Sequence, residues 1–148
     1  MSEFVLTDEQ EAWLQALESG EYKQHTTTPA LCAVDDDGNR TYCCLGVADQ
    51  LFGTELEEQD MPGRIWFASD PDLRGRERGT GRAICSLPTV RRLHLRSAWG
   101  DIENGWALRG KRIHELTVAN DEGRTFAEIA EFIRANPEWV FTQGKEVS

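Results

Sequence analysis

The segment from Thr125 to Pro137 constrains the fold more than any other part of the chain. It begins with Thr-Phe-Ala-Glu, in which Thr125 and Glu128 can cap each other's backbone N–H groups at a helix start. The apolar residues that follow recur at helical spacing: Phe126, Ile129, Ala130 and Ile133. Asn136-Pro137 then stops the pattern, which predicts an amphipathic helix with one face on a hydrophobic core.

Three further segments have helical patterns. Residues 8–18 follow a second capping box, Thr7 to Gln10, and carry apolar residues at helical spacing: Trp13, Leu14 and Leu17. A short helix is predicted at residues 45–52. Another helix is predicted from about Pro88 to about Leu95, because proline is favoured in the first turn of a helix. After the last helix, three residues are expected to pack back onto the body: Trp139, Val140 and Phe141.

Two glycine dipeptides predict β-hairpins. Apolar runs at 30–34 and 41–45 flank Asp37-Gly38, and apolar stretches between 99 and 113 flank Asn104-Gly105. Residues 53–63 are acidic and loop-like, and residues 70–82 are expected to form an exposed basic loop. The sequence therefore predicts an α+β fold, with residues 1–148 in a single compact domain of three to four helices and two short β-hairpins.

The charge is unevenly distributed. The net charge of −10 argues against binding to nucleic-acid backbones, yet residues 64–112 carry 11 basic and 5 acidic residues, whereas residues 1–63 carry 2 basic and 14 acidic. One interpretation is that these parts pair their charges within the fold. The other is an anion site in the basic segment, or an acidic face that imitates nucleic acid.

The sequence predicts a soluble protein of the reducing cytoplasm. No apolar run approaches the roughly 20 residues that span a bilayer, and the acidic N-terminus is unlike a signal peptide. In a reducing compartment, buried thiols are the expected state of the four cysteines: Cys32, Cys43, Cys44 and Cys85.

The cysteines do not have the spacing of a metal site. Structural zinc favours cysteine pairs with two to four residues between them, whereas successive cysteines here lie 11, 1 and 41 positions apart. Adjacent cysteines on a strand, as Cys43 and Cys44 are predicted to be, point to opposite faces. A nucleophilic cysteine needs a nearby base, and no nucleophile signature is present. We expect no metal, no cofactor and no catalytic residue, with a cysteine- or Asp/His-dependent enzyme as the alternative.

Two groups of residues are candidates for ligand binding. The first could close on a phosphorylated ligand, with a solvated loop as the alternative: Arg74, Arg76, Arg78, Arg82, Arg91 and Arg92. The second group starts from Tyr22 and Gln24, which packing alone does not explain. If they line a pocket, we expect three further residues there: Tyr42, Asn120 and Asp121. Asn120-Asp121 also has a simpler interpretation, as a turn and cap leading into the last helix.

Four motifs occur in order along most of the chain: Gly20-x-Tyr22-x-Gln24, Tyr42-Cys43-Cys44-Leu45-Gly46-Val47, Leu87-Pro88, and Asn120-Asp121-x-Gly123-x-Thr125-Phe126-x-x-Ile129-Ala130. With them the chain resembles a family of small uncharacterised proteins encoded mainly by bacteriophages and prophages. It departs from the family in a longer basic loop at 64–84, and in Val118-Ala119, where the family often has Leu.

The resemblance implies a setting rather than an activity, namely a small viral accessory protein in a bacterial host. The excess of 13 arginines over 3 lysines indicates a GC-rich host. A non-catalytic binder of a host protein or of a nucleotide signal is therefore expected, acting in host takeover or anti-defence. The target, the oligomeric state and the pairing of the basic segment stay open, and a small enzyme is the alternative class.

Overall fold

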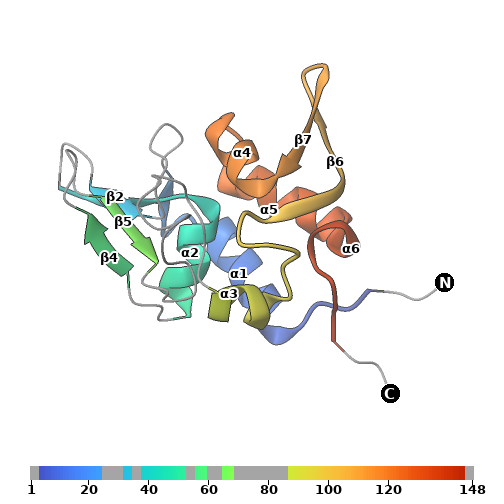
Figure 1. Ribbon diagram of the computed structural model, residues 1–148, viewed down its shortest axis with the longest axis horizontal. Coiled ribbons are helices and arrows are strands. Elements are labelled where there is room, and N and C mark those ends of the chain that lie inside the picture. The colour runs from blue at the N-terminus through green and yellow to red at the C-terminus, as the bar shows by residue number, and fades with distance from the viewer. Residues whose placement is uncertain are drawn as a thin grey trace.

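A computed structural model of the protein describes residues 4–24, 32–34, 38–52, 56–59, 65–68 and 87–145. These residues form a five-stranded sheet, a separate two-stranded sheet and six helices (Figure 1). The predicted α+β fold class is confirmed. The basic loop expected at 70–82 lies outside the described residues.

Four helices were predicted, and all four are present: α1 (Asp8–Ser19), α2 (Cys44–Leu51), α3 (Leu87–Leu93) and α5 (Phe126–Ala135). Both capping boxes form, at Thr7 with Gln10 and at Thr125 with Glu128. Two short helices were not predicted, α4 (Leu116–Asp121) and α6 (Pro137–Val140). The α4 helix follows a strand directly, and the side chain of its first flanking residue, Glu115, makes no capping hydrogen bond that would mark a helix start.

The larger sheet has the strand order β1-β3-β2-β5-β4. Its members are β1 (Lys23–Gln24), β2 (Cys32–Val34), β3 (Arg40–Tyr42), β4 (Leu56–Gln59) and β5 (Ile65–Ala68). The antiparallel pairing of β2 with β3 confirms the first hairpin, and Gly38 has the positive φ of 84° that was expected.

Two details of this region differ from the sequence predictions. Strand β3 ends at Tyr42, so Cys43 and Cys44 do not lie on a strand; Cys43 is the N-cap of α2 and Cys44 its first residue. Within the acidic segment 53–63, residues 56–59 form β4 rather than loop, because they pair with β5. Cross-strand pairing outweighs local composition there.

The second hairpin is present, but its turn is not at the predicted dipeptide. Strands β6 (Asp101–Leu108) and β7 (Lys111–Glu115) are joined at Arg109 and Gly110, whose φ values are 48° and 80°. Asn104 and Gly105, with φ of 68° and 73°, instead form an irregularity inside β6. An Asn-Gly pair marks two left-handed residues, which suit a bulge as well as a turn.

One hydrophobic cluster joins the helices to both sheets. Trp13 of α1 is fully buried, packs edge-on to Phe141, and donates its indole N–H to the carbonyl oxygen of Cys44 at 3.0 Å. Val140 and Phe141 are also buried, which confirms that the chain packs back after α5. Buried Gln10 donates to the carbonyl oxygens of Leu93 and Gln143, so α1 also holds the C-terminal segment.

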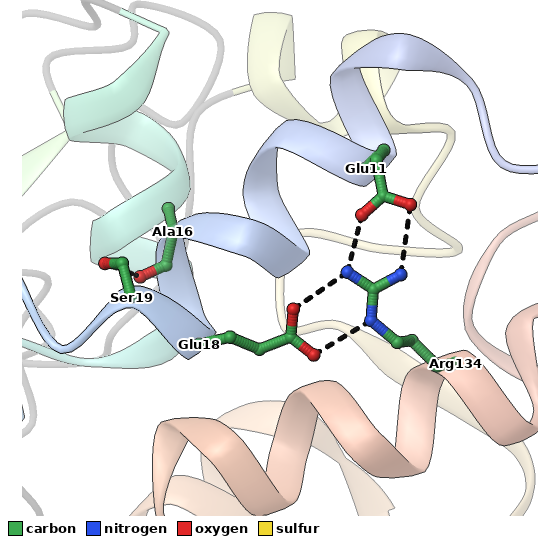
Figure 2. Close-up of polar contacts among 5 residues, drawn as sticks. All are labelled: Glu11, Ala16, Glu18, Ser19 and Arg134. Carbon is green, nitrogen blue, oxygen red and sulfur yellow. Dashed lines mark hydrogen bonds and ion pairs between the residues drawn. The ribbon is translucent and has the colours of Figure 1, made fainter.

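Arg134 clamps α5 to α1 (Figure 2). Its guanidinium donates to both carboxylate oxygens of Glu18, at 2.9 and 2.8 Å, and to both of Glu11. These hydrogen bonds hold the pKa of each carboxyl below its usual 4.5. The acidic N-terminal part thus pairs here with a residue outside the basic segment 64–112.

The basic segment itself makes two described ion pairs. Arg96 pairs with Glu103 at 2.7 Å, within the segment, and Lys111 pairs with Glu122 of the C-terminal part at 2.6 Å. In the described residues, then, the basic segment pairs with itself and with the C-terminal third.

The clamp generates a stability prediction. Arg134→Met should lower the free energy of unfolding at pH 7 by about 1–2 kcal/mol, a range kept small by the partial exposure of all three side chains. The folded-state pKa values of Glu11 and Glu18 are lowered from their usual 4.5. The stability that the two ion pairs contribute is therefore fully present above about pH 4.5, and it is lost as the pH falls through the lowered pKa values. Wild type and variant should therefore converge in acid.

Urea denaturation at neutral and acidic pH measures both effects. The matched control is Arg124→Met, which removes the i,i+4 pair with Glu128 and should lower stability far less than Arg134→Met does. Equal stabilities of wild type and Arg134→Met at pH 7 would contradict the clamp.

Candidate functional site

The structure brings together the five polar candidates predicted from the sequence. The rings of Tyr22 and Tyr42 meet edge to face, with centroids 5.4 Å apart. Next to Tyr22, Gln24 donates from Nε2 to Oδ1 of Asn120 at 2.9 Å and to the carbonyl oxygen of Arg124 at 2.6 Å. Asp121 follows Asn120 at the end of α4. Strands β1 and β3 thus meet the α4–α5 connection here.

Hydrogen bonds explain why two of these residues are polar. Asn120 is fully buried, and its Oδ1 also accepts from the backbone N–H of Cys44 at 3.2 Å. Gln24 accepts at Oε1 from the backbone N–H of Phe126 at 3.1 Å. Gln24 and Asn120 therefore connect β1 to the first turns of α2 and α5. The prediction that Asn120-Asp121 caps the last helix is wrong, because Thr125 caps α5 and Asn120 belongs to α4.

Asp121 is the carboxylic acid of this set. Partial desolvation raises the pKa of its carboxyl, an effect that a hydrogen bond with Asn120 opposes. Its negative charge also contributes to raising the pKa of both neighbouring thiols, Cys43 and Cys44. Burial is the larger cause of the raised pKa of both thiols, and together the two effects keep the cysteines protonated, which is the opposite of what a nucleophilic thiol needs.

The two described thiols are structural. Cys43 is 1% exposed and its Sγ accepts from the backbone N–H of Gly46 at 3.3 Å, while Cys44 is fully buried. Burial raises the pKa of Cys43 to about 12 and that of Cys44 well above its usual 9.0. The prediction of buried, reduced thiols is confirmed for these two. Among the residues that the structure describes, no group of three or more His, Cys, Asp and Glu side chains could hold a metal ion.

The arginine set is only partly described. Arg91 and Arg92 are exposed on α3, and the guanidinium carbon of Arg92 lies 5.1 Å from the centre of the Phe52 ring. Four candidates lie outside the described residues: Arg74, Arg76, Arg78 and Arg82. The described part of this site is therefore a cation–aromatic pair beside a second arginine.

An aromatic cluster (Trp106, Phe132 and Trp139) was not predicted as a site. Trp106 of β6 stacks on Phe132 of α5 with ring centroids 4.2 Å apart, and Trp139 of α6 lies 6.2 Å from Phe132. All three rings are half-buried. Arg96 borders the cluster, because its Nε donates to the carbonyl oxygen of Trp139 at 3.1 Å. The sequence contained one signal for this cluster. Phe132 is apolar but lies beside the buried face of α5 rather than on it, which indicates a second contact surface on that helix.

Comparisons of the chain with protein-family models, curated proteins and solved structures give no match. In the described part of the chain, no helix has the length and apolar character needed to cross a membrane. Function can be inferred from three features: the five polar candidates around Gln24 and Asn120, which we call the polar cluster, the pair of Arg92 with Phe52, and the aromatic cluster.

The amide network predicts a large stability effect from a small change. Asn120→Ala should lower the free energy of unfolding by about 2–3 kcal/mol, because it removes the acceptor of the buried Cys44 N–H and of Gln24. Chemical denaturation measures the loss. Gln143→Ala, which removes an exposed side-chain amide, is the matched control and should leave stability nearly unchanged. A comparable loss in both variants would contradict the network.

Thiol alkylation tests the assignment of Cys43 and Cys44. In the native protein at mildly alkaline pH, iodoacetamide should leave both unmodified, because they are buried and their pKa values lie above the working pH. In denaturant both should react. Mass spectrometry of proteolytic peptides separates them from the other cysteines, and rapid native labelling of either residue would reverse the assignment.

Proposed function

We propose that the protein is a small accessory protein of the bacteriophage type that binds a protein of its bacterial host and does not catalyse a reaction. The aromatic cluster is the observation that supports this proposal. Trp and Arg dominate the binding energy of protein interfaces, and here two tryptophans, Phe132 and Arg96 come together on one half-buried surface. A role in host takeover or anti-defence fits a binder of this size.

Ring stacking and hydrogen bonds hold the cluster in position, which favours binding. The near-parallel stack of Trp106 on Phe132, at 12°, fixes one ring, and backbone contacts to Arg96 fix the segment that carries Trp139. Arg96 also pairs with Glu103, so its guanidinium is held from two sides. A surface ordered before binding loses less conformational entropy when a partner docks.

The cysteine-dependent enzyme is the weaker alternative, since burial and the negative charge of Asp121 work against thiolate formation at Cys43 and Cys44. A nucleotide signal is the second candidate ligand. Its support is the pair of Arg92 with Phe52, beside Arg91: guanidinium groups bind phosphate, and an aromatic ring can stack on a base.

Capture of host proteins tests the proposal. The immobilised protein is exposed to lysate of the host, and the proteins it retains are identified by mass spectrometry. Trp139→Ala should lose the retained partner by at least about tenfold, as expected for an interface residue worth more than 1.4 kcal/mol. Thermal unfolding shows in parallel that the variant is folded.

Tyr22→Ala is the matched control, because it removes another half-buried aromatic ring from a different surface. Retention lost only in Tyr22→Ala would place the interface at the polar cluster. Native mass spectrometry of protein purified from bacterial cells addresses the second candidate. A released anionic compound, lost in Arg91→Gln/Arg92→Gln, would replace the host-protein proposal by the nucleotide one.

A further inference from the structure

The β6–β7 hairpin projects beyond the helices that pack at its base (Figure 1). One face of it turns toward α5, since Trp106 stacks on Phe132 and its cross-strand partner Ile113 is 3% exposed. Side chains alternate along a strand, so Arg112 and His114 lie on the opposite face, and both are exposed. The hairpin thus has an apolar inner face and a polar outer face.

The end of the hairpin is basic. Its three charged residues are all cationic and exposed, and we call them the basic tip: Arg109, Lys111 and Arg112. No acidic residue occurs from 104 to 112, although the whole chain has a net charge of −10. A local concentration of positive charge on an acidic protein directs anionic partners to one place.

The irregularity in β6 positions one of these cations. A Cβ at Gly105 would lie 2.5 Å from Cγ of Arg112, so the arginine side chain runs directly across the glycine. Its Nη1 donates to the carbonyl oxygen of Asn104 at 2.6 Å. Arg112 is therefore held along the outer face, with the other guanidinium N–H groups directed to the surroundings.

The turn places the second arginine at an energetic cost. Arg109 has a φ of 48°, a conformation that L residues other than Asn and Asp adopt at a cost of order 1 kcal/mol and that glycine adopts freely. A glycine at this position would make the more favourable turn. The arginine instead places a guanidinium group at the outermost point of the hairpin.

We propose that the basic tip is the docking surface for a short acidic segment of the partner protein. This inference rests on the proposed function, because it names the chemistry of the partner that function requires. Arginine side chains bind carboxylates in pairs of parallel hydrogen bonds, and two arginines suit a segment with a few carboxylates.

The surroundings of the tip favour a short protein segment over a nucleic acid. Asp121 and Glu122 lie at the end of α4, and Glu122 reaches Lys111 at 2.6 Å. A long polyphosphate lying across the tip would meet these carboxylates. Three cations would release few counterions, which leaves little binding energy for a phosphate backbone.

A defined peptide tests the surface. A dye-labelled peptide of alternating Glu and Leu residues is titrated with the protein at low salt and followed by fluorescence anisotropy. The double variant Arg109→Gly/Arg112→Gln should bind about tenfold more weakly, because two exposed charged contacts contribute about 0.5–1 kcal/mol each. The glycine removes the left-handed arginine, so the variant is expected to keep its fold, which a thermal melt checks.

The matched control is Arg40→Gln/Lys145→Gln, which removes the same charge from two exposed residues outside the hairpin and should bind the peptide as wild type does. Equal loss in both double variants, or none in either, would overturn the inference, because net charge rather than the tip would then explain the result. Duplex DNA is titrated in parallel. Tighter binding of DNA than of peptide, lost in the tip variant, would also overturn it in favour of a nucleic-acid surface.

The two proposals fail in distinguishable ways. A host protein whose retention depends on Trp139 but not on the tip arginines leaves the proposed function standing and overturns this inference. Peptide binding that depends on the tip, without any retained host protein, supports the surface and removes the proposed function. Cross-linking from Lys111 to an acidic segment of the retained protein is the result expected if both hold.

Discussion

The side-chain carbonyl of Asn120 holds the larger sheet to the helices. It is fully buried, and it accepts from Gln24 in strand β1 of that sheet and from the backbone N–H of Cys44 at the start of α2. An unpaired polar group in such a place would cost about 1–3 kcal/mol, so each partner can be buried only if the others are in position. The packing of β1, α2 and α4 is therefore cooperative at one atom, and Gln24 extends it to α5 by accepting from the backbone N–H of Phe126.

Buried side-chain hydrogen bonds also hold α1 to its neighbours. Gln10 is buried with its amide donating to Leu93 and Gln143, and Trp13 donates to Cys44. Each bond joins segments that lie far apart in sequence, and each satisfies a backbone carbonyl oxygen with a side-chain donor. Between them, Gln10, Trp13, Gln24 and Asn120 fix where the helices meet, while apolar packing supplies most of the favourable free energy.

Local signals in the sequence predicted what local physics decides. The capping boxes at Thr7 and Thr125 marked two helix starts correctly, and Asp37-Gly38 marked a real hairpin. Asn104-Gly105 marked two left-handed residues but not their place in the hairpin, since the pairing of Trp106 with Ile113 decides that. The sequence analysis also placed Gln24 and Asn120 in one group, and the structure joins them by a hydrogen bond. Trp106, Phe132 and Trp139 were not grouped in advance, because tertiary packing brings them together from three different elements.

The stack of Trp106 on Phe132 also divides the hairpin into two parts with different free energies of opening. Below it, the backbone N–H of Leu116 donates to Gly100 at 2.8 Å and Ile113 is buried, so opening there exposes core. Above it, the strands are held by pairing between Ala107 and Arg112 and between Leu108 and Lys111. Separating the outer pairs therefore costs less free energy than opening the base, because none of Ala107, Leu108, Lys111 and Arg112 is buried, and the end of the hairpin can rearrange without exposing the core.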